Sequence, residues 1–346
     1  MNFARPEAFE GPILTDISLS DTQTSPLATP SDRAASARRA GASDTRFRWT
    51  AFAAALLVVL IFAGVIISLI NGAIPAFKAF GFGFITDEAW RPTRERFGAL
   101  GSIYGTLVTS AIAMLIALPV GIGVAIFLTD LCPRPLRRPI GIAIELLAGI
   151  PSIIYGIWGL FVFAPWFQTH VQEPIINAVA DVPVLGTIFG GAPFGIGIFT
   201  AGLILSIMIL PFISAVTRDV LETVPSVLKE ASYGLGSTSW EVMWKVCLPF
   251  CSTGVVGGAM LALGRALGET MAVTFVIGNA HKIAPSLFAP GTSISASIAN
   301  EFTEATSEIY RASLIEMGLL LFVITFIVLA FAQLMLRRLE AGKGKK

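Results

Sequence analysis

Long apolar stretches alternate with shorter polar stretches along most of the chain. Six of the apolar stretches are long enough to cross a bilayer as helices, because about 20 residues at ~1.5 Å each cover a hydrocarbon core of ~30 Å. They are residues 49–70, 105–128, 140–163, 194–216, 250–277 and 312–336. The pattern predicts an all-α, polytopic membrane protein with about six transmembrane helices.

The composition agrees with this prediction. Of the 346 residues, 54% are hydrophobic and only 14% are charged, and the mean hydropathy is +0.76, whereas a soluble domain carries about 25% charged residues. The net charge of +1 gives no indication of nucleic-acid binding. The three cysteines (Cys132, Cys247, Cys251) are unevenly spaced, and the two histidines (His170, His281) are far apart. These residues therefore predict neither a disulfide framework nor a metal site.

Residues 1–48 differ from the rest of the chain. They are rich in Ser, Thr, Ala, Pro, Asp and Arg and show little apolar periodicity. This composition predicts a disordered N-terminal tail followed by a membrane domain at 49–346. A regulatory or partner-binding arm is the alternative. The first apolar stretch begins too late and is too long for a signal peptide.

The lysines and arginines in the short loops predict the orientation of the spans. Clusters of these residues precede the first span, follow the second and follow the sixth. The clusters are Arg33, Arg38, Arg39, Arg46 and Arg48; Arg134, Arg137 and Arg138; and Arg337, Arg338, Lys343, Lys345 and Lys346. With six spans, all three clusters lie on one side, so both termini and the loop 217–249 are predicted to be cytoplasmic. Of the opposite loops, 164–193 is either a surface-lying segment or a plain extended loop.

The loop 217–249 has the pattern of a helix, a turn and a second helix. Residues 224–235 predict a short helix that stops at Gly234 and Gly236. Thr238 and Glu241 have the spacing of a capping box, which predicts a second helix from Thr238. Pro249 is then expected to mark the entry to the fifth span. Such a unit is either a docking surface or an ordinary amphipathic connector.

This loop resembles the EAA loop of permeases of ATP-binding-cassette (ABC) importers. The matching residues are Glu230-Ala231-Ser232, then Gly236 after three residues, and Val246-Cys247-Leu248-Pro249 after nine more. Ser232 and Val246 depart mildly from the family pattern, which has Ala and Ile there. In that family the loop holds a coupling helix that sits in a groove of the ATPase subunit. The resemblance therefore assigns Glu230, Ala231, Ser232 and Gly236 to ATPase coupling.

The fifth apolar stretch contains two charged residues, Arg265 and Glu269. They are four residues apart, so we expect them to share one helix face. A charge at that depth costs at least ~2.5–3.5 kcal/mol and commonly marks a functional site. Either the two side chains neutralise each other at a helix interface, or Arg265 contacts an anionic substrate that Glu269 helps to orient. Arginine suits an oxyanion because its planar guanidinium binds two oxygens at once.

Close helix packing is expected around this pair. The spacings Gly254-x-x-x-Gly258 and Gly264-x-x-x-Gly268 are both small-xxx-small patterns, which allow two helices to approach closely. The weaker charged candidates Glu145, Arg218, Asp219 and Glu316 are interpreted as interfacial or snorkelling groups.

Three further motifs resemble the phosphate permeases among these importers. The motifs are 263–270 (LGRALGET), 147–156 (LAGIPSIIYG), and Phe97-Gly98 with Gly105-Thr106-Leu107. The similarity covers residues 50–340. It implies a type I ABC importer permease fold and import of inorganic phosphate across the bacterial inner membrane into the cytoplasm. It also implies a second related permease subunit, two ATPase subunits and a periplasmic phosphate-binding protein.

The sequence contains no G-x-x-x-x-G-K-[ST] motif, so the chain is not expected to be the ATPase itself or another enzyme. ATP and Mg²⁺ are expected to be used by the partner ATPase, and no cofactor is expected on this chain. The alternatives are a permease for another oxyanion (molybdate, sulfate or phosphonate) and a membrane component of phosphate sensing and signalling. An intramembrane enzyme is disfavoured, because no nucleophile and base pair is evident.

Overall fold

The computed structural model describes the backbone of residues 30–343 and the side chains of residues 46–334. The chain divides after Gly64 into two units, Met1–Gly64 and Val65–Lys346, and each is described by itself. The first unit contributes the N-terminal part of α1 (Pro30–Phe80). Its apolar side chains, among them Trp49, Phe52 and Phe62, are exposed all around the helix. A helix that is apolar on every side is suited to lipid or to a partner helix.

The disordered tail predicted at 1–48 stays a prediction. Residues 1–29 lie outside the described residues. The backbone is helical from Pro30, so residues 30–48 are helical where the sequence predicts disorder. The helix begins well before the apolar stretch that predicted it, because charged and small residues with good helix propensity precede that stretch.

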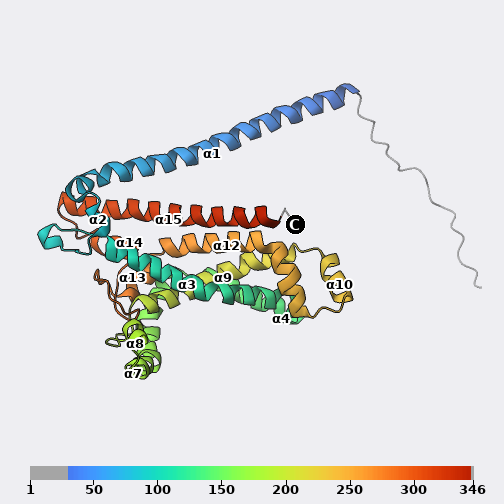
Figure 1. Ribbon diagram of the computed structural model, residues 1–346. Coiled ribbons are helices and arrows are strands. Elements are labelled where there is room, and N and C mark those ends of the chain that lie inside the picture. The colour runs from blue at the N-terminus through green and yellow to red at the C-terminus, as the bar shows by residue number, and fades with distance from the viewer. Residues whose placement is uncertain (1–29, 344–346) are drawn as a thin grey trace, which may run out of the picture. The chain divides into compact units, whose positions relative to one another are not determined.

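Five helices within the described residues are long and apolar enough to cross a membrane. They are the Arg46–Phe80 part of α1, α3 (Leu100–Ile126, continued to Leu131), α9 (Ile198–Glu222), the helix Ser239–Gly268 and α15 (Glu308–Lys343). The spans predicted at 49–70, 105–128, 194–216 and 312–336 are therefore confirmed as helices. Three of them extend further than predicted at both ends, whereas α9 begins later, at Ile198, and ends later, at Glu222. The molecule is all-α (Figure 1).

The third predicted span, 140–163, is wrong as a single helix. α4 (Arg134–Ala148) and α5 (Ser152–Trp158) are bent by 88° relative to each other across residues 149–151. Pro151 has no backbone N–H to donate and its ring crowds the preceding turn, so the helix breaks there. Beyond α5 the chain stays helical to Val179, and the bent pair is long and apolar enough to form a sixth span, broken at the bend, or a re-entrant segment.

The fifth predicted span, 250–277, is wrong as a single helix as well. α12 (Leu248–Gly268) ends at Gly268, and α13 (Met271–Ile277) begins after an interruption at Glu269 and Thr270. At its other end, α12 is continuous with α11 (Ser239–Val242) and the π-helical stretch η5 (Met243–Cys247). Pro249 therefore lies within this long helix and does not mark its start.

α9 forms the centre of the second unit. α3, α12, α13 and α4 pack against it, and α15 packs against α12. Figure 1 shows α3, α9, α12 and α15 running alongside one another. Of the most apolar 18 residues of each helix, 67% are buried in α9 but only 17% in α15. The core therefore lies around α9, while the outer helices keep surface for lipid or partners.

Small residues set the distance between α12 and α9. A Cβ atom at Gly254 would lie 2.5 Å from a methyl carbon of Val220, and one at Gly258 would lie 2.7 Å from a methyl carbon of Val216. The predicted close packing at Gly254-x-x-x-Gly258 is confirmed. Gly268, by contrast, faces open space. The pattern Gly264-x-x-x-Gly268 therefore does not mark a close helix contact at both of its glycines.

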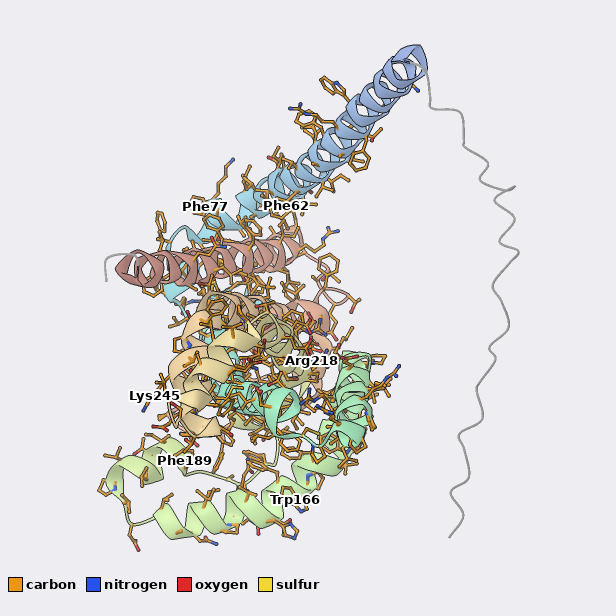
Figure 2. All side chains as sticks on the ribbon, turned by 90° about the vertical axis from the view of Figure 1, so that its right-hand side faces the viewer. Phe62, Phe77, Trp166, Phe189, Arg218 and Lys245 are labelled. Atoms are coloured by element: carbon orange, nitrogen blue, oxygen red, sulfur yellow. The ribbon has the colours of Figure 1, made fainter. Side chains whose placement is uncertain are left out.

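The segment 164–193 is helical, so the interpretation as a plain extended loop is wrong. Figure 2 shows Trp166 and Phe189 on the two limbs of this arm. Its elements are α6 (Ala164–Phe167), η4 (Gln168–Gln172), α7 (Glu173–Val179) and α8 (Pro183–Phe189), and α6 follows η3 (Gly159–Phe163) without a break. Exposed apolar side chains such as Trp166, Val184 and Leu185 agree with a position at a bilayer surface, which stays a prediction.

Candidate functional site

Arg265 and Glu269 lie at the interruption between α12 and α13. Arg265 is in the last turn of α12, and its side chain is exposed. Glu269 directly follows α12 with an extended backbone (φ −68°, ψ 131°) and is half-buried. Its Oε1 accepts a 3.3 Å hydrogen bond from the backbone N–H of Ala272 in the first turn of α13. The carboxylate therefore satisfies one of the free N–H groups that begin the second helix.

That Arg265 and Glu269 share one helix face stays a prediction. α12 is continuous through Gly268 and Glu269 is its C-terminal cap, so the helix breaks only after the pair. Neither side chain forms an ion pair with any other described residue. Mutual neutralisation of the two charges thus has no support in the structure. The role of both residues in a substrate pathway stays a prediction.

The two broken spans meet in the fold. α5, which follows the break at residues 149–151, packs against α13. A Cβ atom at Gly156 of α5 would lie 2.8 Å from the ring of Phe275 and 3.0 Å from the carbonyl oxygen of Met271. Ile150 packs against the core cluster that contains Ala266. Discontinuous helices that meet inside a membrane protein are a common framework for ion and substrate sites.

The predicted helix–turn–helix in the loop is confirmed. α10 (Ser226–Gly234) is followed by a turn in which Gly236 has φ +88°. The capping box is present, because Thr238 Oγ1 accepts from the N–H of Glu241 (3.3 Å) and Glu241 Oε2 accepts from the N–H of Thr238 (3.1 Å). Lys229 of α10 reaches back to Asp130 at the end of α3, with 3.2 Å between Nζ and Oδ1.

The outer surface of this loop is exposed and partly apolar. Among the residues assigned to coupling, Glu230, Ala231 and Gly236 are exposed and Ser232 is half-buried. Ser232 Oγ donates to the carbonyl oxygen of Leu228 (2.8 Å), so its side chain is turned onto the helix. Nearby, Leu235 is 88% exposed. Large apolar groups at such exposure are typical of an interaction surface.

A second polar cluster ties together loops at the opposite end of α3. The carboxylate of Glu301, in α14 (Ile294–Glu301), accepts hydrogen bonds from Trp90 Nε1 (2.5 Å) and Tyr310 Oη (2.6 Å). His281 Nε2 lies 2.9 Å from Glu301 Oε1, and the rings of Trp90 and His281 are stacked 4.9 Å apart. We call these four residues the Glu301 cluster. It joins three chain segments into one polar, mostly buried joint.

Replacing Glu301 with glutamine is expected to destabilise the protein by about 1–3 kcal/mol. The amide has one oxygen in place of two, so one of the three partners of Glu301 would face an N–H₂ group, which cannot accept its hydrogen bond. Burial raises the pKa of Glu301, but the hydrogen bonds from His281, Tyr310 and Trp90 outweigh burial and lower it below the ordinary value. A lowered pKa stabilises the fold above the unfolded value of about 4.3, and this contribution is lost as pH falls through the folded value. In detergent, the thermal unfolding midpoint of Glu301→Gln should therefore be lower than that of the original chain at pH 7 and at pH 5. The difference should shrink progressively below about pH 4.

Glu304→Gln is the matched control, because Glu304 is exposed and its side chain makes no hydrogen bond among the described residues. Equal unfolding temperatures for Glu301→Gln and Glu304→Gln would contradict a stabilising role for the Glu301 cluster.

Sequence reasoning missed the Glu301 cluster and the break between α12 and α13. The residues of the cluster lie as far as 211 positions apart, so no local spacing connects them. The break after Gly149 has a signal, since glycine and proline stand together there. The break at Glu269 has no proline and had no comparable signal.

The chain belongs to the family described as "Binding-protein-dependent transport system inner membrane component", whose model matches residues 117–341. Members of this class are the membrane-spanning subunits of ABC importers. Within it, the chain is 60% identical to the "Phosphate transport system permease protein PstC" of Mesorhizobium japonicum, over 94% of this chain and all of that one. It is 57% identical to the protein of the same description from Pasteurella multocida, over 87% of this chain and 93% of that one.

Solved structures agree on the fold. A chain of a bacterial alginate ABC transporter, in complex with an alginate-bound periplasmic protein, aligns over 86% of this chain and 97% of its own length, with a TM-score of 0.57 and 19% identity. A chain of the inward-facing MetNI methionine ABC transporter aligns over 68% and 94%, with a TM-score of 0.52 and 18% identity. The fold is that of a type I ABC importer permease.

Proposed function

We propose that this chain is a permease subunit of an ABC importer that moves inorganic phosphate across the inner membrane into the cytoplasm. The substrate is supported by the 60% identity, over 94% of the chain, to a relative described as a phosphate permease. The structural observation that carries the mechanism is Arg265, an exposed arginine at the end of a membrane helix. The chain supplies a pathway and no chemistry of its own.

An exposed arginine at this depth needs a covering partner. Charged side chains in membrane segments face a bundle interior or a water-filled cavity, because contact with lipid costs several kcal/mol. We therefore place a second, PstA-like permease subunit against the face of α12 that carries Arg265. A phosphate ion passing between the two permeases meets a guanidinium that can bind two of its oxygens. Glu269 caps α13. Its negative charge also offsets part of the positive charge of Arg265, so that the ion can be released.

Energy reaches this pathway through α10. Glu230, Ala231, Ser232 and Gly236 are assigned to the contact with an ATPase subunit, which binds ATP and Mg²⁺. The ion pair between Lys229 and Asp130 links α10 to the end of α3. α3 packs against α9 and α12, so displacement of α10 is passed to the helix that carries Arg265. Two ATPase subunits serve the two permeases.

Replacing Gly236 with alanine is expected to uncouple transport from ATP hydrolysis. Gly236 has φ +88°, where a Cβ atom costs about 1–2 kcal/mol, so the turn after α10 is distorted. Uptake should fall severalfold while ATP hydrolysis by the complex persists. Gly234→Ala is the matched control, because both positions have open space for a Cβ atom and only Gly236 has a positive φ. Equal loss of uptake in both variants would show that the turn geometry is not the cause.

The orientation follows from the positive charges and from α10. The loop that carries α10 must face the ATPases in the cytoplasm, and both termini then lie on the same side. The Glu301 cluster lies at the other end of α3, toward the periplasm, where a phosphate-binding protein delivers the ion. We therefore propose that the substrate enters at the loops 71–100 and 278–311.

Uptake of radiolabelled phosphate, in a bacterial strain whose own importer is replaced by the one containing this chain, tests the proposed substrate. Excess unlabelled phosphate should abolish accumulation of the label, whereas sulfate, molybdate and a phosphonate should leave it nearly unchanged. Accumulation of labelled sulfate or molybdate in place of phosphate would keep the importer class and overturn the substrate.

A further inference from the structure

A cavity of about 320 Å³ opens between the start of α4 and the end of α9. It is lined by Leu128, Arg134, Arg137, Arg138, Gly141, Ile142, Glu145, Arg218 and Glu222. Arg218 lies on α9 beside α4 (Figure 2). Because Asp130, two residues after Leu128, pairs with Lys229 of α10, the cavity is at the same end of the bundle as the coupling loop. It is separate from Arg265 and from the Glu301 cluster. We call it the arginine pocket.

The pocket has more positive than negative charge. Arg218 pairs with Glu145, with 2.8 Å between Nη2 and Oε1, and its Nη2 also lies 3.4 Å from Asp219 Oδ1. The other three arginines of the pocket are exposed and form no ion pair with any described residue. The lining thus carries four arginines against two carboxylates, those of Glu145 and Glu222, and three of the arginines are held by no ion pair among the described residues.

The position of Arg218 depends on the absence of a side chain at Gly141. A Cβ atom at Gly141 would lie 3.2 Å from Nη1 of Arg218, so the guanidinium rests directly over the backbone of α4. Its side chain is only 24% exposed. The wall of the pocket on the α9 side is therefore fixed, while the three arginines on α4 are free to adjust to a ligand.

We propose that the arginine pocket binds a phosphate group, carried either by an anionic phospholipid headgroup or by free inorganic phosphate. One guanidinium group can bind two oxygens of a phosphate through two parallel N–H···O bonds. Several guanidinium groups in one cavity can therefore bind the different oxygens of the same tetrahedral phosphate. Basic pockets between membrane helices on the cytoplasmic side are typical sites for lipid headgroups. Leu128 and Ile142 line the same cavity, and Leu136 and Leu146 of α4 are exposed beside it.

A ligand in the arginine pocket should affect the transport path, because α4 connects the pocket to the two helix breaks. An anion held by α4 and Arg218 ties α4 to α9. α4 ends at the 88° bend, and α5 beyond the bend packs against α13 next to Glu269. Binding should therefore stabilise the arrangement of the two broken spans. This inference does not depend on which ion the importer carries.

The test compares two double variants of the assembled importer. Arg134→Gln/Arg138→Gln empties the pocket of two guanidinium groups. Arg46→Gln/Arg48→Gln is the matched control, because these arginines are also exposed and form no ion pair among the described residues, and they belong to α1, which does not line the pocket. Binding of phosphate along the transport path should be the same in the two double variants. Any difference in binding between them is therefore due to the arginine pocket.

Two probes separate the two sources of the phosphate group. In lipid-depleted detergent, the thermal unfolding midpoint is measured during titration with inorganic phosphate, with chloride at equal ionic strength as reference. In nanodiscs, phosphatidylglycerol retained by the complex is quantified by mass spectrometry against phosphatidylcholine. The pocket variant should bind one of the two probes at least about tenfold more weakly than the control, since each charged hydrogen bond contributes roughly 1.5–3 kcal/mol. Loss of phosphate binding alone identifies the free ion, and loss of retained phosphatidylglycerol identifies the lipid.

Equal binding of both probes by the two variants would overturn the proposal. Dissociation of the ATPase subunits from the pocket variant alone, with both probes bound normally, would overturn it too, because the arginines would then belong to a protein interface.

Discussion

Replacing Arg265 with glutamine is expected to lower ATP-driven phosphate uptake by about 10- to 100-fold, because a charged hydrogen-bond donor to the ion contributes roughly 1.5–3 kcal/mol. The complex should still assemble, since Arg265 is exposed in the isolated chain and forms no ion pair with the described residues. Its removal leaves no buried partner unsatisfied within the chain. ATP hydrolysis should persist, because α10 and its link to α3 are unchanged.

Two further variants distinguish a pathway role from a structural role of Arg265. Arg265→Lys keeps the charge but loses the planar two-donor geometry, so uptake should be intermediate between the original chain and Arg265→Gln. Arg48→Gln removes an exposed arginine of α1 that is assigned neither to the pathway nor to the coupling contact, and it should leave uptake unchanged. Failure of Arg265→Gln to assemble with its partner subunits, as judged by size-exclusion chromatography, would contradict the pathway role and make Arg265 an interface residue.

Replacing Gly105 with alanine should have the largest effect on the fold. A Cβ atom at this position would lie 1.8 Å from the carbonyl oxygen of Thr292, and the backbone of two segments must separate to admit it. The shift also strains the hydrogen bond from the N–H of Ile294 to Thr106 Oγ1 (2.9 Å). We expect a loss of about 3 kcal/mol or more, at the top of the range for overpacking in a tight core. Lower amounts of the protein in the membrane and a lower thermal unfolding midpoint in detergent would be the measured results.

Gly123→Ala is the control for this prediction. Gly123 lies on the same helix, α3, and a Cβ atom there would meet no neighbouring atom within 4 Å. Alanine should therefore be neutral or slightly stabilising through its better helix propensity. If Gly105→Ala unfolds at the same temperature as Gly123→Ala, the close contact between α3 and the segment around Thr292 does not hold the fold together.

Local features of the sequence predicted much of the fold. Spanning length and apolar composition placed the helices of four spans, because both are properties of one continuous segment. The capping box at Thr238 and Glu241 was predicted for the same reason, since its two partners lie three residues apart. The positive φ of Gly236 agrees with the predicted stop after α10.

The parts that sequence reasoning missed depend on contacts between distant segments. The break at Glu269 is stabilised where α13 packs against α5 and α9, and hydropathy along a single segment carries no information about such packing. The prediction of one continuous span over 250–277 failed for this reason. The Glu301 cluster joins Glu301 at the end of α14 to Tyr310 of α15 and to Trp90 and His281 in two loops. In each case tertiary packing decides the geometry, and local spacing does not.

Transport through this chain is tested most directly by reconstituting the complete importer in liposomes, with labelled phosphate and the binding protein outside and ATP at the ATPase face. We predict accumulation of phosphate that requires ATP, the binding protein and an intact Arg265. Hydrolysis of ATP stimulated by the loaded binding protein, with no phosphate accumulating in the vesicles, would contradict a permease function and favour a sensing role.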